Sequence, residues 1–131
     1  MFPVHPRTAK TLREVGATPQ GIHIVDPQPY LEFNYLVERA KAVITDSGGV
    51  TEETTVMGVP CMTLRTSTER PETVDIGTNE LLGVDPAALR PAMNRLFEGD
   101  WKKGGIPPLW DGQTAPRIVA ALEALLAPGA G

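Results

Sequence analysis

The sequence has little of several features that would place a chain in a specialised class. It holds a single cysteine, Cys61, so no internal disulfide can form, which fits a reducing compartment such as the cytoplasm. Its two histidines, His5 and His23, come without clustered cysteines, so we expect no metal site. Without a long apolar run or the basic and apolar segments of a signal peptide, we expect no membrane partner.

Positive charge is also scarce. Lys and Arg number 12 against 16 Asp and Glu, which gives a net charge of −4. Nucleic-acid-binding domains are usually basic, so we expect no nucleic-acid partner. The length of 131 residues predicts a single domain over residues 1–131. Thirteen glycines and thirteen prolines indicate many tight loops.

Short apolar runs alternate with helical patterns along the chain. Strands are expected at residues 1–4, 22–25, 42–45, 61–64 and 78–82, and helices at residues 8–15, 30–39, 50–57, 86–97 and 114–126. Residues 65–72 read as a polar loop and residues 128–131 as a frayed end. This alternation predicts an α/β fold, a three-layer Rossmann-like arrangement with a parallel sheet between helices.

The most distinctive local motif is Asp46-Ser47-Gly48-Gly49, between an expected strand and an expected helix. Ligands of open parallel sheets bind beyond the carboxyl ends of the strands, and a helix N-terminus suits a phosphate. The glycines let the backbone approach a ligand closely, and Ser47 adds a hydroxyl donor. A plain capped turn is the alternative, because neither a P-loop nor a GxGxxG pattern is present.

Other charged and polar groups that could contact a ligand follow the expected strands. Glu52 and Glu53 lie in the first turn of the helix, where they favour the helix dipole or where one accepts bonds from a ribose. His5 and Arg7 follow the first strand and offer a proton donor and a phosphate-matched fork, unless they are a surface pair. The polar loop places four more candidate ligand contacts at the same edge of the sheet: Arg65, Thr68, Glu69 and Arg70. The alternative is that this loop is only solvated surface.

Four segments in order, FPVHPRT, ITDSGGVTEETTVMGVPCMTLR, TERPETVDIGTNELLG and WDGQTAPRIVAAL, together resemble the non-hydrolysing UDP-N-acetylglucosamine 2-epimerases. The resemblance covers nearly the whole chain. It is to the C-terminal domain of these enzymes, which have two Rossmann-like domains of the glycosyltransferase-B type with the active site between them. We therefore expect that this chain carries the UDP-binding half and that the N-terminal domain is absent from it.

The resemblance implies a UDP-sugar ligand and a role for several residues. Ser47 and the amides of Gly48 and Gly49 would hold the diphosphate, and Glu53 would bind the ribose hydroxyls. Arg7 would help to hold the diphosphate, Phe33 would lie near the uracil, and His5 matches an active-site histidine. The implied reaction inverts C2 of UDP-GlcNAc to give UDP-ManNAc by elimination and re-addition of UDP, with no metal or redox cofactor.

The family's acid and base carboxylates lie in its N-terminal domain, so the resemblance implies that this chain is inactive alone. The carboxylates present, Glu52, Glu53, Glu69 and Glu72, are not expected to replace them. Three alternatives follow: a split-epimerase subunit that needs a separate N-terminal partner, a UDP-sugar-binding or regulatory module, and a fragment with no role of its own. A homodimer is typical of the family.

Overall fold

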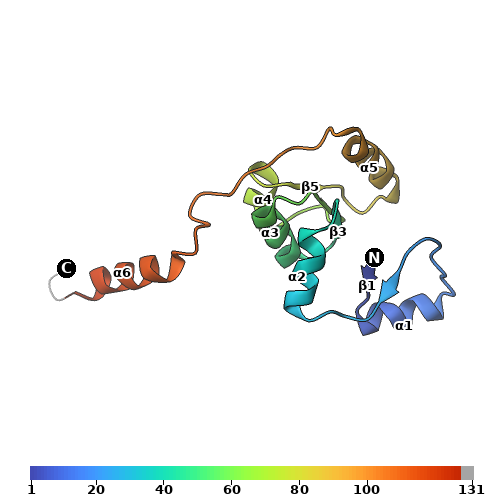
Figure 1. The fold of residues 1–131 in the computed structure, drawn as a ribbon. Helices are drawn as coiled ribbons and strands as arrows, with labels where there is room; N and C mark the ends of the chain where they lie inside the picture. Colours follow the sequence, from blue (N-terminus) through green and yellow to red (C-terminus); the bar gives the residue numbers. More distant parts are fainter. Residues whose placement is uncertain (128–131) are drawn as a thin grey trace. The chain divides into compact units, whose positions relative to one another are not determined.

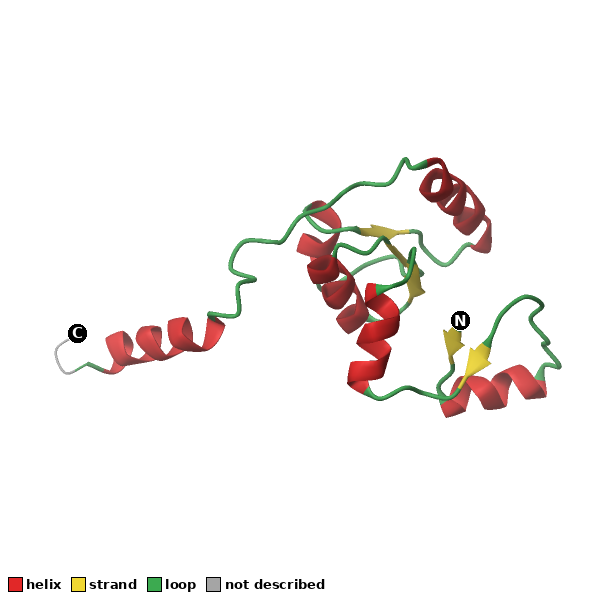
Figure 2. Ribbon diagram, in the orientation of Figure 1, coloured by secondary structure: helices red, strands yellow, loops and turns green. Residues whose placement is uncertain are grey.

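The computed structural model describes residues 1–127 and divides into two compact units, residues 1–39 and residues 40–131 (Figure 1). Both units contain parallel strands with flanking helices, which confirms the predicted α/β class (Figure 2). The single domain expected over residues 1–131 stays a prediction. The expected frayed end, residues 128–131, lies outside the described residues.

The first unit is built around a βαβ motif followed by a helix. Its elements are β1 (Phe2–Pro3), α1 (Pro6–Glu14), β2 (Ile24–Val25) and α2 (Tyr30–Glu38). Strands β1 and β2 pair in parallel, with Phe2 opposite Ile24. Helix α1 begins at Pro6 and not at the predicted Thr8, because His5 occupies the N-cap and its side chain accepts from the amide of Arg7. Proline suits a first helical position, where its missing N–H costs nothing.

The second unit is a three-stranded parallel sheet in the order β3-β4-β5. Its elements are β3 (Val43–Thr45), α3 (Gly48–Met57), β4 (Cys61–Thr63), α4 (Pro71–Asp75), β5 (Asn79–Leu81), a 3-10 turn (Pro86–Ala88), α5 (Leu89–Glu98) and α6 (Thr114–Leu126). Helix α3 ends at Gly58, whose φ of +69° is a left-handed conformation that glycine adopts without strain. The polar loop expected at residues 65–72 is wrong at its end, where Pro71 opens α4.

The two faces of this sheet are packed with different chemistry. On one face, Met62 of β4 packs with Ala92 and Leu96 of α5 in an apolar cluster. The other face meets α3 and α4 and is rich in polar side chains that are almost completely buried: Thr51, Thr54, Thr55, Thr63, Thr73, Thr78 and Asn79. The α5 side is therefore held by hydrophobic burial and the α3 side largely by hydrogen bonds.

A segment without helix or strand, rich in glycine and proline, follows α5 and leads to α6. The indole Nε1 of Trp101 donates to the carbonyl of Thr78 at 2.9 Å, which ties this segment to the start of β5. Helix α6 has the predicted bounds, and Arg117 in its first turn pairs with Asp111 before it. Within the described part of the chain, no helix has the length and apolar character needed to cross a membrane.

Candidate functional site

The N-terminus of α3 is the centre of the candidate site. Strand β3 ends at Thr45, and Ser47 takes the N-cap position with extended backbone angles, φ −90° and ψ 125°. The amide of Ser47 donates to the hydroxyl of Thr45 at 3.0 Å, whereas the Ser47 side chain makes no capping hydrogen bond. The first amides of a helix lack partners inside the helix and carry partial positive charge, so this end favours an anion.

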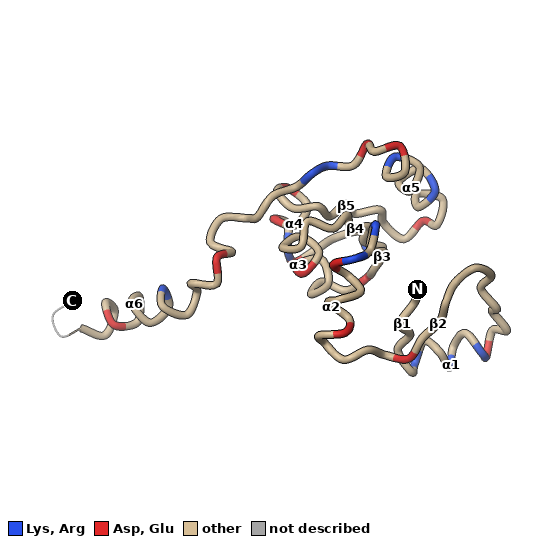
Figure 3. The backbone as a smooth tube through the Cα atoms, viewed as in Figure 1, with Lys and Arg blue, Asp and Glu red and all other residues tan. Residues whose placement is uncertain are grey.

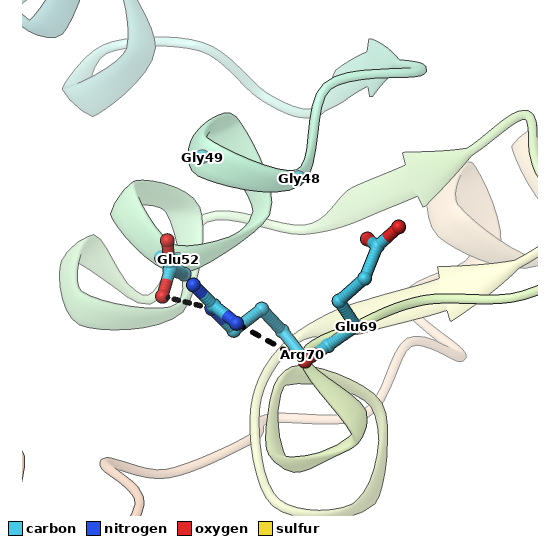
Figure 4. Close-up of a pocket in the computed structure, with 5 residues that line it drawn as sticks. All are labelled: Gly48, Gly49, Glu52, Glu69 and Arg70. Carbon is cyan, nitrogen blue, oxygen red and sulfur yellow. Dashed lines mark hydrogen bonds and ion pairs between the residues drawn. The ribbon is translucent and has the colours of Figure 1, made fainter.

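A pocket of about 260 Å³ opens beside this helix end and is lined by Gly48, Gly49, Glu52, Glu69 and Arg70 (Figure 4). The first three come from α3 and the last two from the loop that leads into α4. A Cβ added to Gly49 would meet no atom within 4 Å, and one added to Gly48 would meet only the Glu69 carboxylate, at 3.8 Å. The glycines thus leave the start of α3 open to a ligand.

Two ion pairs cross the pocket and its rim. The Nε of Arg70 donates to Glu52 at 2.6 Å, and the guanidinium of Arg65 donates to both oxygens of Glu69, at 3.2 and 3.0 Å. The backbone amide of Glu69 and the guanidinium of Arg65 hold the pKa of Glu69 below its ordinary value. The bond to Glu52 raises the pKa of Arg70. A phosphate that enters the pocket would compete with these carboxylates for the guanidinium groups.

The structure brings together most of the residues that the sequence places around the second unit's strand ends. Gly48, Gly49, Glu69 and Arg70 line the pocket, while Arg65 pairs with Glu69 and the hydroxyl of Thr68 accepts from the amide of Arg70. Ser47 directly precedes the pocket, and neither it nor Glu53 is among the lining residues. Glu52, which the sequence offers only as the alternative to Glu53 for the ribose, lines the pocket. Its spacing of four residues from Gly48 places both on one face of α3, which is a signal that sequence reasoning could have used.

The three remaining predicted site residues belong to residues 1–39 and are described on their own. The Nδ1 of His5 accepts from the amide of Arg7 at 3.2 Å, so the neutral ring carries its proton on Nε2. His5 and Arg7 are exposed, and Phe33 is half-buried on α2. Their proposed roles stay predictions.

Basic and acidic residues alternate along the backbone of both units (Figure 3). No cluster of three or more His, Cys, Asp or Glu that could hold a metal ion exists among residues 1–127. Cys61 is completely buried, and this burial raises the pKa of its thiol. The site chemistry consists of helix amides, hydroxyls, and two arginines paired with the carboxylates of Glu52 and Glu69. Of these groups, the amides and the arginines suit a phosphate.

Comparison with known proteins decides the family. The sequence profile described as UDP-N-acetylglucosamine 2-epimerase matches residues 1–123. This chain belongs to that family. A UDP-N-acetylglucosamine 2-epimerase of Methanococcus maripaludis is 40% identical to it over 126 residues, which cover 91% of this chain and 33% of the relative.

Solved structures of UDP-GlcNAc 2-epimerases share the fold. That of the Methanocaldococcus jannaschii enzyme, in complex with UDP-GlcNAc and UDP, is 40% identical with a TM-score of 0.80, over 94% of this chain and 35% of the other. That of the Neisseria meningitidis enzyme, bound to UDP-GlcNAc, is 32% identical with a TM-score of 0.78, over 93% and 34%.

The chain spans about a third of the length of these UDP-GlcNAc 2-epimerases and matches their C-terminal part. The predicted family and the predicted likeness to the C-terminal part of these enzymes are therefore confirmed.

Proposed function

We propose that this chain is the nucleotide-binding part of a UDP-GlcNAc 2-epimerase and that its pocket holds the diphosphate of a UDP-sugar. One observation carries the proposal: Gly48, Gly49 and Arg70 meet around the N-terminus of α3. Support comes from relatives whose structures contain UDP or UDP-GlcNAc. A helix end with two glycines and an arginine supplies the backbone donors and the positive charge that a diphosphate needs.

The ligand would engage α3 in two ways. The amides of Gly48 and Gly49 and the hydroxyl of Ser47 donate to the phosphate oxygens, and Arg70 exchanges its bond with Glu52 for one with the ligand. Glu53, further along α3, accepts bonds from the ribose hydroxyls. With its carboxylate on the ribose, Glu53 stays away from the negative charge of the phosphates.

The resemblance to the family assigns further contacts to three residues of the first unit. Phe33 would lie against the uracil and Arg7 would contact the diphosphate. The Nε2–H of His5 would donate to the oxygen through which UDP leaves, since its Nδ1 is already occupied by the amide of Arg7. Inversion at C2 of UDP-GlcNAc through loss and re-addition of UDP places negative charge on the leaving phosphate, which these donors stabilise.

The acid and base carboxylates for C2 would come from the N-terminal part of the enzyme, in the same protein or in a partner chain, in the cytoplasm. We therefore expect no conversion of UDP-GlcNAc to UDP-ManNAc by the 131-residue chain alone. Proton NMR of the sugar detects either epimer. Formation of UDP-ManNAc by the pure chain would contradict this division of labour.

Calorimetric titration of UDP into the chain tests the binding site. Ser47→Ala is a clean probe, because its hydroxyl caps nothing and its loss should leave the melting temperature unchanged. We expect about a tenfold rise in Kd, since hydrogen bonds to charged groups are worth about 1.5–3 kcal/mol. Glu53→Ala should also weaken binding. Thr18→Ala, which removes an exposed hydroxyl from a loop of the first unit, is the control.

Two outcomes would overturn the proposal. One is a folded wild-type chain that gives no saturable heat with UDP. The other is equal affinity for UDP in Ser47→Ala and Thr18→Ala, which would place the diphosphate elsewhere.

A further inference from the structure

A chain of hydrogen bonds, buried in its first two links and part-buried in the last, runs from the centre of the sheet to the backbone of Arg70. The hydroxyl of Thr63 on β4 donates to Oδ1 of Asn79 on β5 at 2.6 Å. The Nδ2 of Asn79 donates to the hydroxyl of Thr73 on α4 at 3.2 Å, and that hydroxyl donates to the carbonyl of Arg70 at 2.8 Å. We call Thr63, Asn79 and Thr73 the relay.

The relay is shielded from bulk solvent, and each of its hydrogen bonds has a defined donor and acceptor. Thr63, Asn79 and Thr73 have exposed fractions of 1%, 0% and 0%, so bulk solvent does not reach these three residues. Each hydroxyl is used as a donor toward the next acceptor, and this fixes the orientation of the Asn79 amide. Buried networks of this kind hold their members in one arrangement, because an unsatisfied polar group is costly in a low-dielectric interior.

The end of the relay is the residue that carries the exposed cation of the pocket. Arg70 is the N-cap of α4, and its side chain makes no capping bond. Helix α4 has only five residues and therefore few hydrogen bonds of its own. The carbonyl of Arg70 is held by the amide of Thr73 at 3.0 Å and by the Thr73 hydroxyl. From this fixed backbone, the guanidinium reaches Glu52 on α3 (Figure 4).

We propose that Asn79 and Thr73 are positioning residues that hold Arg70 over the pocket for the diphosphate. This proposal rests on the proposed function, because it says which residues fix Arg70 in the proposed diphosphate site. The relay links the rigid centre of the sheet to a short helix that has little stability of its own. When the relay is broken, Arg70 is still present, but its backbone is no longer held and can shift.

The first test reads the position of Arg70 without any ligand. Thr73→Val removes the hydroxyl and keeps the shape, and Thr73→Ser restores a hydroxyl. Thr78→Val is the matched control, since Thr78 is 1% exposed and donates to the carbonyl of Val59 at 2.6 Å, outside the relay. The readout is the Nε–H signal of Arg70 in a proton–nitrogen correlation NMR spectrum, identified by its absence in Arg70→Lys.

We expect this signal to move toward that of free arginine in Thr73→Val, because the bond to Glu52 is loosened. It should stay in place in Thr73→Ser and Thr78→Val. An unmoved signal in a folded Thr73→Val chain would overturn the inference. Should circular dichroism show that Thr73→Val does not fold, Thr63→Val takes its place, because it breaks the relay at its far end and should move the signal in the same direction.

The second test measures the consequence for binding. The Kd for UDP should rise about fivefold in Thr73→Val, the factor that corresponds to one hydrogen bond of about 1 kcal/mol. Thr73→Ser and Thr78→Val should bind as the wild type does. If the wild type does not bind UDP, the proposed function fails. The Nε–H signal of Arg70, which needs no ligand, still tests whether the relay positions Arg70. If Thr78→Val weakens binding as much as Thr73→Val, the effect is general destabilisation and the inference is wrong.

Discussion

Gly77 is a position where one added methyl group should strongly destabilise the second unit. A Cβ at this buried residue would lie 2.5 Å from the hydroxyl oxygen and 2.7 Å from the methyl carbon of Thr55 on α3. It would also lie 2.6 Å from the backbone carbonyl oxygen of Thr73 on α4. A carbonyl cannot swing aside as a long side chain can, so the backbone of α4 must move in Gly77→Ala.

The loss of stability in Gly77→Ala follows from its clashes with both α3 and α4. Overpacking a well-packed interior costs about 1–3 kcal/mol, and we expect the upper end because both α3 and α4 must yield. For a domain of about 100 residues, 1 kcal/mol corresponds to about 4–8 °C, so the melting temperature should fall by about 10–20 °C.

Urea and thermal unfolding, followed by circular dichroism, measure this effect against Gly105→Ala. A Cβ at Gly105 would meet only a methyl group of Ile76, at 3.9 Å, which is ordinary contact. That variant should stay within about 0.5 kcal/mol of the wild type. If both variants melt together with the wild type, the close approach at Gly77 is not a real constraint and the reasoning fails.

Three further predictions use other residues. Gly49→Ala should keep or raise the melting temperature, because its Cβ meets no atom within 4 Å, and should weaken UDP binding by filling the ligand's space; unchanged calorimetric affinity would refute the close approach. Cys61, completely buried with a raised pKa, should resist a thiol reagent at about pH 8 until urea unfolds the chain; rapid labelling of the native chain would contradict its burial. Arg117 lowers the pKa of Asp111 to about 2, so this pair stabilises the start of α6 at neutral pH and loses that contribution as pH falls from about 4 toward 2. The pKa of Asp111, measured by NMR titration, should therefore rise toward its ordinary value in Arg117→Gln, and an unchanged midpoint would refute the assignment.

The sequence predicts the elements of this chain well wherever the pattern is long or strongly apolar. The bounds of α6 are as predicted, and the buried strand β4 lies within the predicted residues 61–64. Errors occur where local chemistry competes with pattern. Helix α3 begins at Gly48, two residues before the predicted Val50, because a ladder of helical hydrogen bonds outweighs the poor helix propensity of glycine. Helix α4 was missed because five residues are too few for a periodic signal.

The candidate site, too, could be predicted only in part from the sequence. The rule that parallel strands end at one edge is enough to bring the loop around Arg70 toward the glycines that begin α3. It cannot say that Glu52 holds Arg70, because that depends on side-chain rotamers across 18 residues of sequence. The bond between Thr63 and Asn79 spans 16 residues and leaves no trace in any local pattern. Roles for His5 stay predictions from resemblance.

The polar layer between α3 and the sheet has a thermodynamic consequence. Unfolding exposes buried hydroxyl and amide groups there, such as those of Thr54 and Asn79, along with the apolar cluster around Met62. Newly hydrated apolar surface raises the heat capacity by about 0.45 cal/mol/K per Å², whereas polar surface lowers it by about 0.26. The second unit should therefore have a smaller heat-capacity change per residue than a domain with two apolar layers. Its stability then varies less between cold and warm conditions.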